Sequence, residues 1–367
     1  MNLSQKIAQM LMIGFKGESL EENSPIFQDL IQQRIGGVIL FDRDPFTLEL
    51  NSRNIRSPTQ LKNLIQQLQT AAGNDLLIAL DYEGGDQPIS DRPRLGVSRL
   101  NSAYGFPETY TAKAFAKLPF EEAVTVAALM AETVKNLGIN VVFAPVVDVT
   151  LFPGQSCVDL VERSFSDEVD KVIACANLFI SAYQKNNIAC CLKHFPGYGS
   201  ARKDTHFSPS DITSTWNRDL ELRPYQIFNA KADMVMTTHV SNRQLDPSGL
   251  PATLSQKMLQ DLLRVQLNYQ GLIVADDLQM KGLTTSFSLT EIVELAINAG
   301  NDILLFGNML EYDADIASRV ISIVMELIKI GKISEQRIDD SYQKILTLKN
   351  KLNIKTQQCS ISPFSSI

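Results

Sequence analysis

The sequence predicts a single-domain α/β protein, a (β/α)₈ barrel. Eight short apolar runs recur along the chain, followed by turn residues and then by segments of helical periodicity. Such units build parallel sheets, and eight of them close naturally into a barrel. An open doubly wound sheet is the alternative, but it would usually have fewer strands and a glycine-rich dinucleotide turn, which this sequence lacks. The predicted strands are 9–15, 37–41, 76–81, 141–145, 189–194, 233–239, 272–276 and 302–306.

Helices between these strands are predicted from apolar periodicity and from end signals. Segment 57–72 begins with Ser-Pro, and segment 121–137 is followed by Gly138, which suits a helix C-cap. The same logic predicts helices at 167–185, 255–266, 289–299 and 312–330, and a C-terminal helix at 334–352. We expect one domain over residues 1–352 and an exposed tail without function at 353–367.

Composition narrows the class of protein. The 367 residues are 44% hydrophobic and 20% charged, which is typical of a globular enzyme with a large core. The net charge of −7 argues against a nucleic-acid partner, because phosphate binding needs clustered lysine and arginine. The five cysteines form neither a CxxC pattern nor an even set, which indicates reduced structural thiols. No signal-peptide pattern and no run of about 18 apolar residues occurs, so we expect a cytoplasmic protein without a membrane partner.

Polar residues appear where the apolar runs end. Barrel strands are buried on both faces, so a charged residue at a strand end is costly unless it is paired or used. Strand ends meet at one rim of a barrel, where the active sites of such enzymes lie. The residues at this predicted rim are Asp81, Asp148, Lys193, His194, His239 and Asp276.

Two segments carry the chemistry. In KHFPGYG, Lys193 and His194 precede a turn that lets the backbone pass close to a ligand, and both side chains could bind vicinal hydroxyls. Further on, Asp204 stands two residues before His206, and a carboxylate so placed can accept the imidazole N–H and raise its basicity. This pair suits a general acid/base that works near neutral pH.

The run GLIVADD delivers two carboxylates to the rim. Because successive side chains of a strand alternate, only one of them can point into the mouth, and we expect Asp276 there while Asp277 anchors the neighbouring loop. A carboxylate opposite an acid/base is the equipment for glycoside hydrolysis. Metal-dependent barrel hydrolases usually gather several histidine and acidic ligands, as in a His-x-His pair, and this sequence has none, so we expect no metal and no other cofactor.

The motifs together resemble the β-N-acetylglucosaminidases of glycoside hydrolase family 3. The resemblance runs in order from about residue 3 to residue 308 and rests on DYEGG, FAPVVDV, ERSF, KHFPGYGSARKDTHFSP, VMTTHV, LPATLS and GLIVADDLQMKG. It implies that Asp276 is the nucleophile, His206 the acid/base and Asp204 its partner. It further implies that the sugar is held by Asp81, Arg92, Arg163, Lys193 and His194, with Arg92 placed by an insertion of about three residues.

The sequence departs from the family at four positions. Asp86 stands where arginine commonly follows Gly-Gly, Ala275 replaces serine before the nucleophile, Tyr198 replaces a frequent histidine, and Ser166 replaces glycine. These departures bear on the detail of the pocket and hence on substrate preference.

The resemblance implies a retaining exo-β-N-acetylglucosaminidase that works through a glycosyl-aspartate. Relatives act on N-acetylglucosaminyl-1,6-anhydro-N-acetylmuramic acid and its peptides, so we expect a small muropeptide substrate, a role in peptidoglycan recycling and a monomer. Two alternatives stay open. A phosphorylase would use phosphate in place of water, because a neutral imidazole repels phosphate less than a carboxylate does. A non-catalytic sugar-binding barrel would have lost turnover.

Overall fold

Eight parallel strands form the inner wall of the molecule. The computed structural model describes residues 1–43, 53–85 and 97–354. All eight predicted strands are confirmed, most of them shorter than predicted by one to three residues at an end. They are β1 (Leu11–Gly14), β2 (Gly37–Ile39), β3 (Leu77–Leu80), β6 (Val141–Val142), β7 (Ala189–Phe195), β9 (Met234–Thr237), β11 (Leu272–Val274) and β12 (Leu304–Phe306).

The sheet closes on itself. Neighbouring strands follow the order β11-β9-β7-β6-β3-β2-β1-β12. A parallel bridge between Val274 and Ile303 joins the two ends of that order, which rules out the open-sheet alternative. The wall is closely packed at the ends of β1 and β12, where a Cβ on Gly14 would lie 2.0 Å from the carbonyl oxygen of Gly307. All seven residues of β7 are buried, as a strand covered on both faces requires.

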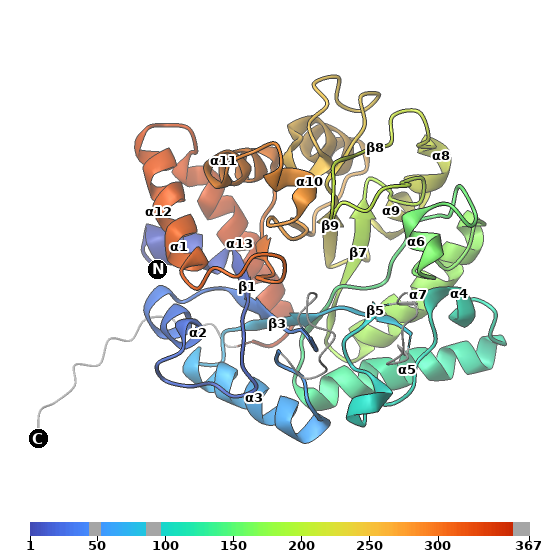
Figure 1. The fold of residues 1–367 in the computed structure, drawn as a ribbon, viewed down its shortest axis with the longest axis horizontal. Helices are drawn as coiled ribbons and strands as arrows, with labels where there is room; N and C mark the ends of the chain where they lie inside the picture. Colours follow the sequence, from blue (N-terminus) through green and yellow to red (C-terminus); the bar gives the residue numbers. More distant parts are fainter. Residues whose placement is uncertain (44–52, 86–96, 355–367) are drawn as a thin grey trace, which may run out of the picture.

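Helices surround the strands, whose labels gather around the centre of Figure 1. The longer ones are α3 (Pro58–Ala71), α5 (Phe120–Leu137), α7 (Val169–Lys185), η4 (Lys257–Gln266), α11 (Leu289–Ala299), α12 (Ile316–Lys329) and α13 (Glu335–Lys351). Shorter ones are α1 (Leu3–Gln9), α2 (Pro25–Gln28), η1 (Asp29–Gln33), α4 (Ala112–Phe115), α6 (Cys157–Leu160), α8 (Arg218–Glu221), α9 (Arg223–Phe228) and α10 (Lys281–Thr284). The N-terminal α1 packs against α13, so the two ends of the barrel domain meet.

The predicted end signals act as expected in most helices. Ser57 accepts a hydrogen bond from the backbone of Gln60 at the start of α3, and Gly138 ends α5 in the left-handed conformation. Helix α12 begins four residues later than predicted. Asn308 forms hydrogen bonds with both backbone groups of Asp313, which holds the preceding segment in a loop. The predicted helix 255–266 is a π-type helix, η4, that starts after its Ser255 cap.

Two pairs of short strands lie at the rim of the barrel. β4 (Tyr82–Gly84) pairs antiparallel with β5 (Val97–Ser98), and β8 (Ser210–Asp211) pairs with β10 (Val240–Ser241). Residues 86–96, which contain Asp86 and Arg92, lie outside the described residues, as does the predicted tail from residue 355 onward. Among the described helices, none is long and apolar enough to span a membrane.

Candidate active site

A pocket of about 190 Å³ opens where the barrel strands end. Six of the residues that the sequence predicted for the site line it, namely Asp81, Arg163, Lys193, His194, His206 and Asp276. Asp204 reaches it through His206, and Arg92 belongs to the segment outside the described residues. Apolar side chains such as Phe143, Met236 and Leu305 complete the wall. The pocket therefore combines an apolar surface with several charged groups, as sugar-sized ligands require.

Asp276 comes two residues after the end of β11 and lies on the pocket wall. Its Oδ1 accepts a hydrogen bond of 2.8 Å from the backbone N–H of Asp277, which fixes the orientation of the carboxylate. The preceding Ala275 is buried, and its N–H binds the carbonyl of Ile303 in the next strand. A rigid barrel strand thus presents the predicted nucleophile to the pocket.

Asp277 anchors the loop that follows, as the alternation of side chains predicted. Its Oδ1 accepts hydrogen bonds from the N–H groups of Gly307 (3.0 Å) and Gln279 (3.1 Å). A Cβ on Gly307 would lie only 2.5 Å from its Oδ2, so the carboxylate fits tightly beside β12. Burial raises the pKa of Asp277 to about 6 in spite of those two hydrogen bonds.

Asp204 and His206 form a hydrogen-bonded dyad. Their side chains are half exposed, at 42% and 47%, and Nδ1 of His206 lies 2.6 Å from Oδ1 of Asp204. A carboxylate accepts, so Nδ1 carries a hydrogen and Nε2 is left to exchange a proton in the pocket. Burial lowers the pKa of His206, but the hydrogen bond to Asp204 and the charges of Asp204 and Asp276 outweigh it, so the pKa lies above the usual histidine value. Burial raises the pKa of Asp204, yet His206 brings it down to about 2.

Lys193 is a buried cation held between two carboxylates. Its Nζ lies 2.8 Å from Asp81 and 2.6 Å from Glu83, and its side chain is 2% exposed. Burial raises the pKa of Glu83, but the charges of Arg163 and Lys193 outweigh it and hold that pKa at about 2. Glu83 is therefore an ionised partner of buried cations. Glu83 was not among the residues predicted for the site, although it follows the end of β3 by only three residues.

Arg163 links Glu83 to His194. It donates two hydrogen bonds of 2.8 Å to the carboxylate of Glu83, and Nη2 lies 3.1 Å from Nε2 of His194. A guanidinium only donates, so Nε2 of His194 accepts. Nδ1 of His194 lies 2.7 Å from Asp148, whose other oxygen accepts from the backbone of His194. The imidazole is fixed at both nitrogens, in one orientation.

Arg99 is the main site residue that sequence reasoning missed. It stands just after β5, donates to Asp81 (3.2 Å) and to Asp42 (3.3 Å), and lines the pocket. Burial raises the pKa of Asp81, but the charges of Lys193 and Arg99 outweigh it and keep that pKa below its usual range. Asp81 is thus an ionised acceptor with lone pairs left for ligand hydroxyls. No apolar run precedes Arg99, so the rule of polar residues after strands could not find it.

His239 has a supporting place. Its Nδ1 lies 2.8 Å from Thr253 Oγ1, and its Nε2 lies 3.0 Å from the carbonyl oxygen of Asp277. A carbonyl only accepts, so Nε2 carries a hydrogen and braces the loop behind the nucleophile. Burial lowers the pKa of His239, which keeps the ring neutral. Within the described part of the chain, no three histidine, cysteine or acidic side chains gather as a metal site would require.

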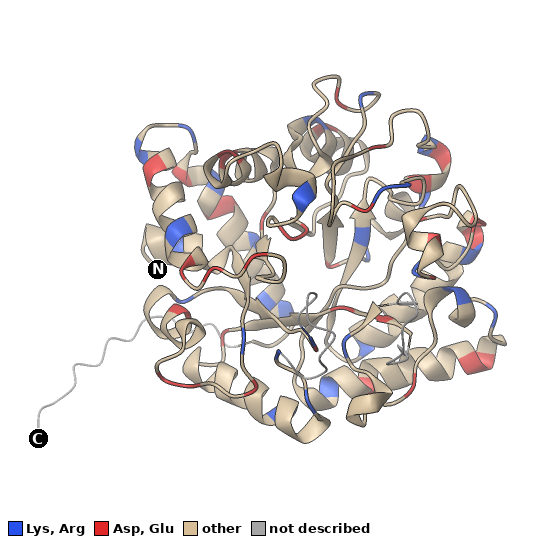
Figure 2. Ribbon diagram, in the orientation of Figure 1, with Lys and Arg blue, Asp and Glu red and all other residues tan. Residues whose placement is uncertain are grey.

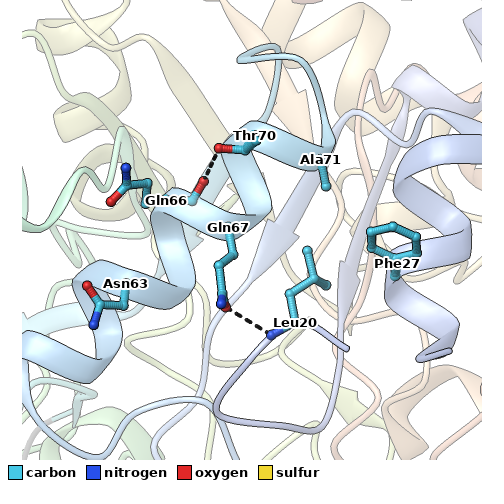
Figure 3. Close-up of a pocket in the computed structure, with 7 residues that line it drawn as sticks. All are labelled: Leu20, Phe27, Asn63, Gln66, Gln67, Thr70 and Ala71. Atoms are coloured by element: carbon cyan, nitrogen blue, oxygen red, sulfur yellow. Dashed lines mark hydrogen bonds between the residues drawn. The ribbon is translucent and has the colours of Figure 1, made fainter. Parts of the chain in front are cut away.

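A second hollow, of about 540 Å³, lies away from this chemistry. Leu20 and Phe27 face α3 across it, and α3 contributes Asn63, Gln66, Gln67, Thr70 and Ala71, as Figure 3 shows. The side chains that line it include no ionisable group, so it offers no acid, base or nucleophile. Figure 2 shows basic and acidic residues interspersed along the outer helices, with both signs also near the centre of the molecule.

A closed (β/α)₈ barrel whose small pocket is lined by a carboxylate and by an imidazole paired to a second carboxylate has the groups that a barrel glycosidase needs. Residues 2–348 match the family described as "Glycosyl hydrolase family 3 N terminal domain". A β-hexosaminidase of Haemophilus ducreyi is 33% identical over 362 residues, which are 96% of this chain and 93% of that protein. A β-hexosaminidase of Idiomarina loihiensis is 33% identical over 306 residues, 81% of this chain and 83% of that protein.

Solved structures agree with this match. A family 3 β-N-acetylglucosaminidase from Paenibacillus superposes with a TM-score of 0.81 at 27% identity and covers 100% of this chain and 66% of that one. A β-N-acetylhexosaminidase from Beutenbergia cavernae gives a TM-score of 0.80 at 25% identity and covers 95% and 99%. The chain belongs to glycosyl hydrolase family 3, and it is a glycoside hydrolase.

Proposed function

We propose that the protein is a retaining exo-β-N-acetylglucosaminidase that works through a covalent glycosyl-Asp276. The observation that carries the proposal is that Asp276 and His206 line one small pocket, with Asp204 hydrogen-bonded to Nδ1 of His206. The β-hexosaminidases that resemble this chain over most of their length support the choice of sugar.

The reaction has two steps. Asp276 attacks the anomeric carbon, the glycosidic bond breaks, and Nε2 of His206 gives its proton to the leaving oxygen. Water then attacks the glycosyl-aspartate, His206 takes a proton from it, and the sugar leaves with its original anomeric configuration. Asp204 holds the ring in place and stabilises the imidazolium form.

The charged groups around the pocket hold the sugar. Asp81 accepts hydrogen bonds from hydroxyl groups, while Lys193 and Arg163 donate to oxygen atoms. Each of the two cations is already paired to a buried carboxylate, so its position is set before substrate arrives. Arg92 joins this set if the segment that carries it turns toward the pocket. A volume of about 190 Å³ suits one sugar unit, which favours removal of a single terminal residue.

The natural substrate we propose is a muropeptide or disaccharide that ends in β-linked N-acetylglucosamine, met during peptidoglycan recycling in the cytoplasm. A monomer is sufficient for this, because the described chain supplies both proposed catalytic groups. A pocket that holds only the terminal sugar would leave the aglycone outside it, which agrees with a bulky anhydro-sugar or peptide as the leaving group.

A paired assay tests the activity. A chromogenic β-N-acetylglucosaminide should be hydrolysed much faster than the matching β-glucoside, with no dependence on inorganic phosphate. Turnover that needs phosphate and yields a sugar phosphate would make the protein a phosphorylase. Binding of N-acetylglucosamine without turnover of either compound would make it a sugar-binding barrel.

The acid/base role of His206 has its own test. His206→Ala should lose about 10²–10⁴-fold in rate on a substrate with a poor leaving group, the usual contribution of general acid/base catalysis. The first step should suffer far less on an activated aryl glycoside, because its leaving group needs little protonation. Equal losses on both substrates would make His206 a binding residue. The nearby acids offer no easy replacement, since Glu83 and Asp148 are occupied by buried donors.

A further inference from the structure

Tyr198 lies between the Asp148–His194 pair and the segment that carries the catalytic dyad. It is 4% exposed and belongs to the turn that follows β7. Its backbone N–H donates a hydrogen bond of 2.8 Å to Oδ1 of Asp148, the carboxylate that also orients His194. The ring centroids of Tyr198 and His194 lie 5.6 Å apart. The backbone and the ring of Tyr198 therefore contact the Asp148–His194 pair.

The phenol oxygen of Tyr198 contacts the segment that carries the dyad. It accepts a hydrogen bond of 2.8 Å from the backbone N–H of Thr205 and donates 3.2 Å to the carbonyl of Lys203. These two backbone groups flank Asp204. Burial raises the pKa of Tyr198 well above its usual value, so the hydroxyl keeps the proton that it donates.

The segment that carries the dyad needs such a hold. Asp204 and His206 are half exposed, and their mutual hydrogen bond fixes one side chain only relative to the other. On the opposite side, the carbonyl of Thr205 accepts from Gly282 (2.9 Å) at the start of α10, where a Cβ would lie 3.0 Å from that oxygen. The segment is thus clamped between the phenol of Tyr198 and α10.

We propose that the Tyr198 hydroxyl is a positioning group for the acid/base, holding the 203–205 backbone so that Nε2 of His206 stays over the scissile oxygen. The proposal rests on the acid/base role assigned to His206 above. Holding a catalytic group in place matters because a misplacement of about 1 Å can cost about 10²-fold in rate. The hydroxyl contact acts on proton transfer, whereas the ring and the backbone of Tyr198 support the Asp148–His194 pair on the other side.

The test is Tyr198→Phe, which keeps the ring and the N–H to Asp148 and removes only the hydroxyl. We expect kcat on a poor leaving group to fall about tenfold to a hundredfold, within the range set by misplacement of a catalytic group. KM and the inhibition constant of N-acetylglucosamine should stay near the wild-type values, and an activated aryl glycoside should lose less. The matched control is Tyr269→Phe, because its buried hydroxyl also bonds a backbone carbonyl, that of Leu272 at 3.1 Å, away from the dyad.

A double variant separates the two proposals. In the His206→Ala background, Tyr198→Phe should cause no further loss, because the group that it positions is gone. Additive losses, equal losses on good and poor leaving groups, or a raised KM at unchanged kcat would each overturn the positioning role. If His206→Ala itself shows no dependence on the leaving group, the acid/base assignment fails first.

A second variant guards against a folding defect. Tyr198→His keeps a polar ring, but its nitrogens reach less far from the backbone than the phenol oxygen, so it should be as slow as Tyr198→Phe on the poor leaving group. Thermal unfolding of both variants should match that of Tyr269→Phe within the cost of one buried hydrogen bond, about 1 kcal/mol. If the histidine variant is folded and as fast as the wild type on the poor leaving group, the phenol hydroxyl is not needed to hold the segment.

Discussion

At the scale of single residues, the site separates groups that bind from a group that transfers protons. Lys193, Arg163 and Glu83 are locked in buried ion pairs, which fixes their charge and their place. His206 has one carboxylate partner and a half-exposed ring, so it can change its protonation state during a reaction. Because the charges of the ion-paired residues stay fixed while His206 can gain and lose a proton, the dyad can act as the acid/base beside them.

The dyad predicts a pH effect. Asp204 raises the pKa of His206, so Asp204→Asn should lower it. The first step needs protonated His206, and activity is lost as the pH rises through its pKa. The alkaline limb of kcat/KM should therefore move to lower pH in the variant. Profiles over about pH 5–8, where histidine titrates, would measure this.

A charge-matched control completes the pH test. Asp170→Asn removes the same charge from an exposed position on α7, where the side chain is 77% exposed, and should leave the profile in place. An alkaline limb that stays fixed in Asp204→Asn, or that moves to higher pH, would show that another group controls it.

Which residues could be predicted depends on how local their signal is. Asp276 and Lys193 stand at the ends of apolar runs, so the rule for barrel rims finds them. Asp204 and His206 stand two positions apart, so the local sequence shows them as a pair. The pair of Glu83 and Arg163 joins positions 80 residues apart, and no local pattern reports it. Arg99 reaches the pocket by way of the β4–β5 hairpin, whose two-residue strand β5 has no visible periodicity.

At the scale of elements, α13 is tied to the barrel by a buried carboxylate at the start of β12. Asp302 is fully buried and accepts from Arg264 (2.7 Å), from Ser341 (2.9 Å) and from the backbone of Ile273 (3.0 Å), with Arg337 at 3.5 Å. It lies at the N-terminal ends of the strands, the face where residues serve stability. The C-terminal helix is therefore part of the barrel domain, as its predicted boundary implies.

Asp302→Ala should lower the free energy of unfolding by about 3–5 kcal/mol, because it removes the buried carboxylate that balances the charges of Arg264 and Arg337. Chemical denaturation followed by circular dichroism measures this. The control is Glu326→Ala, which removes an exposed partner of Lys329 on α12 and should cost less than about 1 kcal/mol. A loss for Asp302→Ala no larger than that of the control would mean that Asp302 does not hold α13 in place.

Sequence patterns predicted elements better than their ends. Every barrel strand was found, because burial on both faces leaves a continuous apolar run. The start of α12 was placed too early, because the side chain of Asn308 bonds the backbone N–H and carbonyl of Asp313 and holds the segment before the helix in a loop. Such a side-chain contact competes with helix formation and is not visible in periodicity.

At the scale of the whole molecule, the barrel brings the ends of eight strands to one rim, so residues more than 190 positions apart, from Asp81 to Asp276, share a pocket. We predict that this site needs no metal ion. Hydrolysis of a chromogenic β-N-acetylglucosaminide should be unchanged by a chelator. Activity that is lost in chelator and restored by a divalent ion would contradict this and would call for a ligand set that includes residues outside the described ranges.

The central claim is that Asp276 becomes glycosylated during turnover, and mass spectrometry of trapped enzyme tests it most directly. In His206→Ala the second step lacks its base, so an activated aryl β-N-acetylglucosaminide should leave one N-acetylglucosaminyl unit on the protein. Digestion should place that unit on Asp276, and Asp276→Ala should fold normally, carry no adduct and show no turnover. An adduct on Asp277, or steady product release with no adduct and an active Asp276→Ala, would contradict the account.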